Sequence, residues 1–307
     1  MSMLRSGNLR LRCFFLAGAA GLACLIAPTV AAHAHHADVT VFVSALDFKG
    51  IPLTDLEKDD WGVREDGANR PLVDARRATE KLNVVLLVDS TKLTQPYLDD
   101  IRKACLTLVK TLRAGDPNAA VSLMTFGGSA TTLVDFGKPA GDLDKALQRL
   151  FPNQETRGVM FEALIAASKQ LTKSEAPRRA IVMLNLENEG EGSANTVTPQ
   201  TVANAVLPSH ASLWVISFHN ISAGERASGS EPNRDLLLSN LPTQTGGIRN
   251  VVNTTNVLEG NLKRIAEVLL AQYAVTYSRP EGAAPKLLQM AVARPGAQML
   301  VPRTPPN

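Results

Sequence analysis

The residues with the clearest chemical potential follow directly after an apolar run. Residues 84–88 are all Val or Leu, and the chain continues with Asp89, Ser90, Thr91 and Lys92. A carboxylate and two hydroxyls supply hard oxygen atoms of the kind that Mg²⁺ and other divalent cations bind. A run that is apolar on both faces, and too short for a membrane span, is typical of a central strand in a parallel sheet. Open α/β sheets bind ligands at the carboxyl ends of such strands, where Asp89 would lie.

The turn after this strand resembles the first motif of von Willebrand factor A (vWA) domains. In that family an Asp-x-Ser-x-Ser turn holds a divalent metal ion, and the metal binds an acidic group on a partner protein. Here the turn is Asp89-Ser90-Thr91-Lys92-Leu93, so a threonine and a leucine stand at the positions of the two serines. The resemblance implies a vWA-like fold with a degenerate metal-ion-dependent adhesion site.

Two further loops complete the metal site of the family, and both depart from the pattern here. The family has Gly-Gly-Thr where this chain has Thr156-Arg157-Gly158-Val159, so that an arginine stands where close backbone approach needs glycine. The family has Asp-Gly after the second central strand, where this chain has Leu186 followed by Glu187. Each departure removes or obstructs an oxygen ligand that octahedral magnesium would need.

Three interpretations of these loops are open. In the first, which we favour, Asp89 is satisfied by backbone amides and hydroxyls and the site needs no cofactor. In the second, Lys92 or Arg157 pairs with Asp89 as an internal cation. In the third, Asp89, Thr91 and Glu187 keep a weak site for Mg²⁺ or another divalent cation, completed by water. The candidate residues for binding a ligand or partner are Asp89, Thr91, Lys92, Thr156, Arg157 and Glu187.

The elements that position these loops alternate as a doubly wound α/β fold requires. Strand-like and helix-like segments alternate from Val84 to Leu270, which predicts a mostly parallel, vWA/Rossmann-like sheet. Thr94 is the expected N-cap of the first helix and Gly115 its left-handed C-cap, while Asn256 and Glu259 are expected to cap the last helix. Further strands are expected at 120–126, 131–136, 180–186, 212–218 and 248–252, and helices at 142–150, around 161–171, at 199–207 and around 258–269.

The two ends of the chain are predicted to form a small β-domain. Valines alternate with other residues in 39–43, and the tail after 273 contains strand-like runs separated by Pro-Gly turns. Neither set has enough strands to be stable alone, so we expect them to pair. Both segments also resemble those of bacterial secreted vWA-related proteins. The predicted division is a signal peptide at 1–32, a His-containing linker at 33–37, β segments at 38–79 and 273–307, and the vWA-like domain at 80–272.

The N-terminus predicts export to the periplasm or out of the cell. Arg5, Arg10 and Arg12 precede an apolar run at 13–27, and Val30-Ala31-Ala32 is a suitable cleavage tripeptide. A membrane anchor is the alternative, but the run is short for a span and no stop-transfer pattern follows. Cleavage would expose His33-Ala34-His35, which either binds copper or nickel or, as we favour, is a tail without function.

Cleavage would also change the charge and the cysteine content. The formal net charge of +3 at pH 7 would fall to zero, because the signal contains three arginines and no acid. A neutral chain lacks the basic footprint of a nucleic-acid-binding protein. Cys105 would be the one remaining cysteine, on the apolar stripe of a helix, where we expect a buried small hydrophobe and not a reactive thiol.

The sequence favours a binding module over an enzyme. It contains no Gly-x-Ser-x-Gly and no His-Glu-x-x-His. We therefore predict an exported vWA-type module that binds another protein, without a metal ion, without a membrane span after cleavage and without enzymatic activity. The alternatives are an exported metal-dependent hydrolase with Asp89 as its acid, and a structural component of the cell envelope.

Overall fold

Strand β5 (Leu82–Asp89) lies in the middle of a six-stranded sheet with the order β12-β11-β9-β5-β6-β7. The computed structural model describes residues 36–187, 190–219, 232–282 and 285–305. Both neighbours of β5, namely β6 (Ala120–Phe126) and β9 (Arg178–Leu186), run parallel to it. The sheet continues with parallel β11 (Ser212–Phe218) and β12 (Arg249–Val252), and ends at the other edge with antiparallel β7 (Ala130–Val134). The predicted fold class is confirmed.

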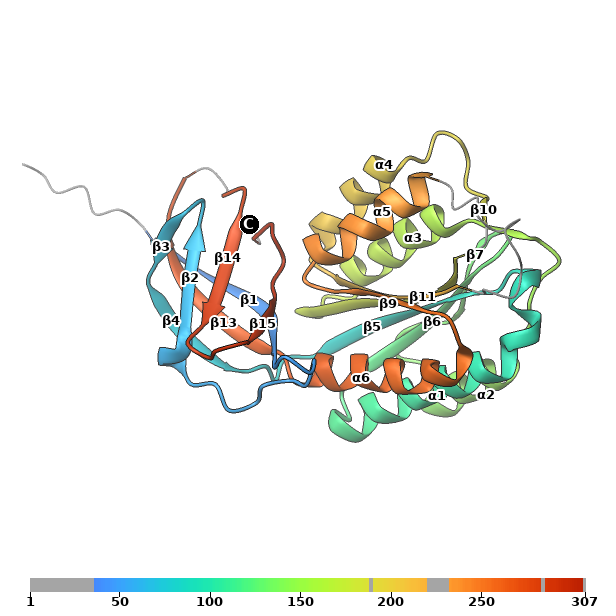
Figure 1. Cartoon of the computed structure of the whole chain (residues 1–307), viewed down its shortest axis with the longest axis horizontal. Helices are drawn as coiled ribbons and strands as arrows, with labels where there is room; N and C mark the ends of the chain where they lie inside the picture. The colour runs from blue at the N-terminus through green and yellow to red at the C-terminus, as the bar shows by residue number, and fades with distance from the viewer. Residues whose placement is uncertain (1–35, 188–189, 220–231, 283–284, 306–307) are drawn as a thin grey trace, which may run out of the picture. The chain divides into compact units, whose positions relative to one another are not determined.

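Helices cover both faces of this sheet (Figure 1). One face packs against α1 (Leu98–Gly115), α2 (Ala140–Gln148) and α6 (Leu258–Leu270). The other packs against α3 (Met160–Lys173), α4 (Pro199–Val206) and α5 (Pro232–Gln244). Alternate residues of β5 serve the two cores, because successive side chains of a strand point to opposite faces. The first core contains Val84, Leu86 and Val88, and the second contains Val85 and Leu87.

Three local features differ from the sequence-based expectation. Helix α1 begins at Leu98 after a 3-10 turn at Lys92–Tyr97, and the Thr94 hydroxyl donates to the Thr91 carbonyl at 2.7 Å instead of capping the helix. Gly115 is the last residue of α1 and is followed by an extended Asp116, so it is not a left-handed cap. Helix α6 has no side-chain cap at its start, so the expected role of Asn256 and Glu259 is wrong.

The cysteine on α1, Cys105, is buried and is not a reactive thiol. Cys105 is fully buried and unpaired, and burial raises the pKa of its thiol to about 12. The thiol is therefore protonated at neutral pH and packs as a small apolar group.

Strands from the two ends of the chain pair with each other. Strand β1 (His36–Leu46) is antiparallel to β13 (Tyr273–Pro280), and its last three residues pair with β15 (Gln298–Leu300). The far edge of this sheet is β4 (Leu72–Arg77), paired with β13. A second sheet contains β14 (Leu288–Val292), β2 (Trp61–Glu65) and β3 (Ala68–Arg70). Strand β1 begins within the predicted linker at 33–37.

These strands enclose a core of their own, in which the rings of Trp61 and Tyr273 lie 5.1 Å apart between centroids. The predicted signal peptide and His33 to His35 lie outside the described residues. No helix in the described part of the chain has both the length and the apolar character that crossing a membrane requires.

Candidate functional site

Asp89 ends β5 with its carboxylate turned into the protein, where the side chain and backbone together are 1% exposed. Its Oδ1 accepts hydrogen bonds from the Thr91 backbone amide at 2.9 Å and from the Thr91 hydroxyl at 2.8 Å. Its Oδ2 accepts a hydrogen bond from the backbone amide of Leu186 at 3.0 Å. Both oxygens are therefore engaged by the protein itself, in the manner of the first interpretation given above.

The loop after α2 lies beside the turn that follows Asp89. The Asn153 amide donates to the Ser90 carbonyl at 2.7 Å, and the Lys92 amide donates to the Glu155 carbonyl at 2.7 Å. These two bonds place Thr156 next to the Asp89 turn, and the Thr156 side chain is exposed. Because the Leu186 amide bonds to Asp89, the three predicted loops are adjacent.

Neither predicted internal cation neutralises Asp89. Within the part of the chain that the structure describes, Asp89 forms no ion pair with Lys92 or Arg157. Lys92 is exposed, and Arg157 donates from Nη2 to the Glu191 carbonyl at 2.6 Å. Arg157 belongs to the short strand β8 (Arg157–Gly158), which pairs in parallel with β10 (Gly190–Glu191). Its guanidinium thus holds the third loop instead of the acid.

Glu187 is turned toward strands β11 and β12. Its Oε1 pairs with the Arg249 guanidinium and its Oε2 lies 3.1 Å from Nδ1 of His219. Arg249 also donates from Nε to the Ser217 hydroxyl at 3.1 Å, and that hydroxyl lies 3.1 Å from Oδ1 of Asn185. Of the residues in this network, only Glu187 was a predicted site residue. A signal of it in the sequence is that Asn185 and Ser217 are polar residues at paired positions near the ends of two strands with apolar centres.

These donors do not fit an octahedral divalent cation. Asp89 has both oxygens engaged, Glu187 is paired with Arg249, and a leucine side chain stands at positions 93 and 186. Among the described residues, no group of three or more His, Cys, Asp or Glu side chains is placed to hold a metal ion. What the arrangement offers chemically is a set of hydrogen-bonded loops around an acid whose two oxygens are both engaged within the fold.

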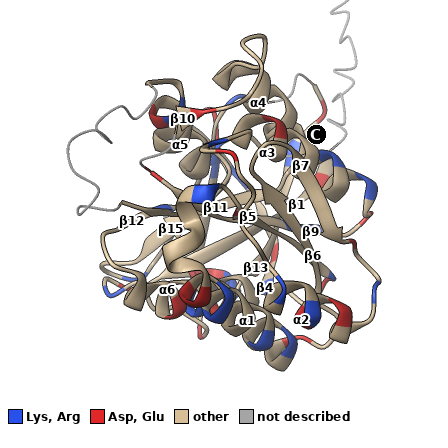
Figure 2. Ribbon diagram, turned by 90° about the vertical axis from the view of Figure 1, so that its right-hand side faces the viewer, with Lys and Arg blue, Asp and Glu red and all other residues tan. Residues whose placement is uncertain are grey.

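The exposed side of these loops combines apolar and basic side chains. Phe151 is 69% exposed, and its ring centroid lies 5.3 Å from the guanidinium carbon of Arg102. Leu93 is 36% exposed, and Lys92, Thr156 and Arg157 are exposed residues of the same two loops. We call Lys92, Leu93, Phe151, Thr156 and Arg157 the loop face. Figure 2 views the molecule from the side where the parallel strands end, and basic and acidic residues are interspersed there.

The six-stranded sheet, its helices and its loops match a known protein family. Residues 83–266 match the family described as the von Willebrand factor type A domain. No curated protein matches the chain. Solved structures with a similar fold include a D319A mutant of the PilB minor pilin from Streptococcus sanguinis, with 12% identity, a TM-score of 0.48, and coverage of 64% of this chain and 62% of that one.

Two further solved structures also have a similar fold. The pilus adhesin SpaC from Lactobacillus rhamnosus GG has 13% identity, a TM-score of 0.49, and coverage of 69% of this chain and 34% of that one. The SpRpn10 VWA domain has 12% identity, a TM-score of 0.42, and coverage of 59% and 93%. The chain spans less than two thirds of the length of either pilus protein.

The hydrogen bonds of Asp89 predict a large loss of stability when its carboxylate is removed. Asp89→Ala leaves the Thr91 and Leu186 amides without an acceptor, so we expect unfolding to become easier by about 3 kcal/mol. Asp89→Asn keeps one acceptor oxygen and should cost roughly half as much. Urea denaturation of the purified variants measures both. Asp38→Ala, at an exposed position of β1, is the matched control and should change stability by less than about 0.5 kcal/mol. An Asp89→Ala variant as stable as the parent would contradict this account.

Proposed function

The chain belongs to the von Willebrand factor type A domain family, and we propose that it is an exported, non-enzymatic module that binds another protein without a metal ion. The binding surface in this proposal is formed by the loops around Asp89, Thr156 and Glu187, with the loop face as its exposed part. Membership of the family supports a role in protein interaction. The single observation that carries the proposal of metal independence is that both oxygens of the Asp89 carboxylate accept hydrogen bonds from the protein itself.

These hydrogen bonds matter because, in the family, the acidic group of the partner protein binds through the metal ion. Where a metal bridges the two proteins, the domain must present oxygen atoms with free coordination sites. In this chain the corresponding acid is buried and bonded, and Leu186 contributes only its amide at the third loop. Binding energy must therefore come from the exposed side chains of the loop face.

Phe151 is the proposed centre of that surface. Interface hot spots are enriched in aromatic and arginine side chains, and the exposed Phe151 ring already packs on Arg102. Arg102 is itself fixed, since its Nε and Nη2 donate to the Leu150 carbonyl at 3.2 and 2.6 Å. A pre-ordered aromatic anchor loses little conformational entropy on binding. Lys92, exposed in the turn after Asp89, favours a partner patch that places acidic groups around an apolar pocket.

An enzymatic role for Asp89 is disfavoured by the same geometry. A general base must reach the proton that it abstracts with a free oxygen. Asp89 is 1% exposed and both of its oxygens accept hydrogen bonds from residues of the fold. The acid therefore supports the loops and is not offered to a substrate.

Calorimetric titration with Mg²⁺, Mn²⁺ or Ca²⁺ tests metal independence. We expect no binding in the low-micromolar range, because binding would require breaking the bonds of Asp89 to Thr91 and Leu186. Glu187→Gln should leave this result unchanged, since Glu187 is paired with Arg249. A tight signal that disappears in Asp89→Asn would refute the proposal that the module works without a metal.

Site-specific photo-crosslinking in the native cell tests the binding surface. A photoreactive phenylalanine analogue at Thr156 should give a defined adduct with another protein, whereas the same analogue at Asn118, exposed at the opposite end of the sheet, should not. Adding Phe151→Ala should lower the yield at position 156 by about tenfold, which corresponds to about 1.4 kcal/mol. Equal adducts at positions 156 and 118 would argue against the loop face. An adduct made of two copies of this chain would instead favour a structural component that self-associates.

Export is tested by cell fractionation with N-terminal sequencing. The predicted signal peptide should be absent from the exported chain, whose first residue should be His33. Replacing Ala32 by Arg is expected to block cleavage, because signal peptidase sites require small residues there. Recovery of a chain that begins at Met1 in the cytoplasm would contradict export.

A further inference from the structure

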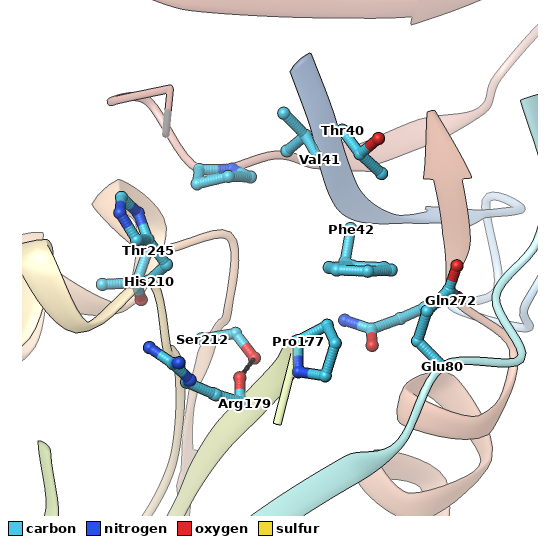
Figure 3. A pocket seen from close by; sticks show the side chains of 11 residues that line it. Thr40, Val41, Phe42, Glu80, Pro177, Arg179, His210, Ser212, Thr245 and Gln272 are labelled. Atoms are coloured by element: carbon cyan, nitrogen blue, oxygen red, sulfur yellow. Dashed lines mark hydrogen bonds between the residues drawn. The ribbon is translucent and has the colours of Figure 1, made fainter. Parts of the chain in front are cut away.

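A cavity of 440 Å³ lies at the amino ends of β9 and β11, at the opposite end of the sheet from Asp89. It is lined by Phe42 from β1, by Pro177 and Arg179 at the start of β9, and by His210 just before β11 (Figure 3). Pro302, near the end of the described chain, also lines it. Small-molecule binding sites are usually cavities of about 300 to 1,000 Å³ with a few converging polar groups.

Arg179 brings a positive charge to this cavity without a matching negative one. Its Nε donates to the Ala176 carbonyl at 2.8 Å and its Nη1 donates to the Ser209 carbonyl at 3.0 Å. In the described part of the chain no carboxylate lies within 4.0 Å of this guanidinium, and Nη2 has no hydrogen-bond partner. Burial lowers the pKa of Arg179, although an arginine stays charged in proteins. The cation is thus held in place by two carbonyls and lacks a counter-ion.

The other polar groups of the cavity are neutral or already paired. Burial, followed by the charge of Arg179, lowers the pKa of His210, so this imidazole is neutral at pH 7 and can donate one hydrogen bond. The Glu80 carboxylate is paired with Arg76 at 2.5 Å and also accepts from the Thr79 amide. The Ser212 hydroxyl accepts from the Trp214 indole nitrogen at 2.8 Å.

The apolar part of the lining is formed by Val41, Phe42, Pro177 and Pro302, and the other polar residues that line the cavity are Thr40, Thr245 and Gln272. Figure 3 shows the Phe42 ring and Pro177 on one side of the cavity and Arg179 with His210 on the other. A ligand with a single negative charge and a flat or branched hydrocarbon body would match both sides. A dianion such as phosphate would match less well, because it would have to be desolvated against Phe42 and lie near Glu80.

We propose that this cavity binds a small carboxylate that carries an apolar body, with its carboxylate on Nη2 of Arg179 and its hydrocarbon against Phe42 and Pro177. The His210 imidazole donates the second hydrogen bond to the same carboxylate. This site is separate from the loop face, so it operates whether or not the loop face binds a protein.

Calorimetry on the purified exported chain tests the proposal with phenylacetate as the probe. We expect millimolar or tighter binding of phenylacetate, and at least tenfold weaker binding of phenylacetamide, which has the same shape without the charge. Acetate should bind more weakly because it lacks the ring, and inorganic phosphate should not compete. Equal binding of phenylacetate and phenylacetamide, tighter binding of phosphate, or no binding of phenylacetate would each overturn the proposal.

Variants locate the binding within the cavity. Arg179→Gln should weaken phenylacetate binding at least tenfold, and Arg264→Gln, at a half-exposed position of α6, should leave it unchanged. Because Arg179 also holds two carbonyls, Phe42→Ser serves as a second variant that keeps the guanidinium; it should weaken phenylacetate and leave acetate unaffected. Thr156→Ala, on the loop face, should not alter phenylacetate binding. Retention of full affinity by both Arg179→Gln and Phe42→Ser would place the ligand elsewhere and refute the assignment.

Discussion

The burial of strand β5 on both faces is the constraint from which the site follows. Its eight residues are all buried, so each face needs a layer of helices and each edge needs a neighbouring strand. Parallel β6 and β9 supply the edges, and the chain can leave this strand only at the centre of the sheet. Asp89 therefore emerges among the ends of its neighbours, where its charge must be satisfied by whatever groups those ends provide.

What they provide is two backbone amides and the Thr91 hydroxyl, all of which donate hydrogen bonds to Asp89. A buried carboxylate is costly unless it is hydrogen-bonded, and the Thr91 and Leu186 amides supply such bonds. Leu186 serves both the core and the turn after Asp89. Its side chain is 5% exposed and packs in the core, while its amide points to Asp89. The Asp89 turn and the end of β9 are therefore joined by hydrogen bonds of the protein itself.

The features that were predictable from sequence are those encoded in continuous runs of residues. The apolar composition of β5, β9 and β11 records burial on two faces, and it sufficed to place the sheet and Asp89. Helix α5 was missed because Leu236, Leu237 and Leu238 are consecutive and do not show helical spacing. Gly115 was misassigned because its role is packing: a Cβ there would lie 2.4 Å from Cδ1 of Leu270. The pairing of Glu187 with Arg249 joins distant strand ends, which no local pattern records.

The two adjacent arginines at the start of β9 differ in how their guanidinium nitrogens are hydrogen-bonded. A guanidinium whose three nitrogens all donate to groups of the fold is structural, whereas one with an unbonded nitrogen can bind a ligand. Arg178 is 2% exposed, and its guanidinium donates to the carbonyls of Ala78, Glu80 and Leu269 and to the amide oxygen of Gln272. Arg179 points to the opposite face, as alternation along a strand requires, and meets two carbonyls and a cavity. Asp89 resembles Arg178, since each is a buried charge satisfied by the backbone around it. By the same criterion, Arg179 is equipped to accept a small anion, at the end of the sheet remote from Asp89.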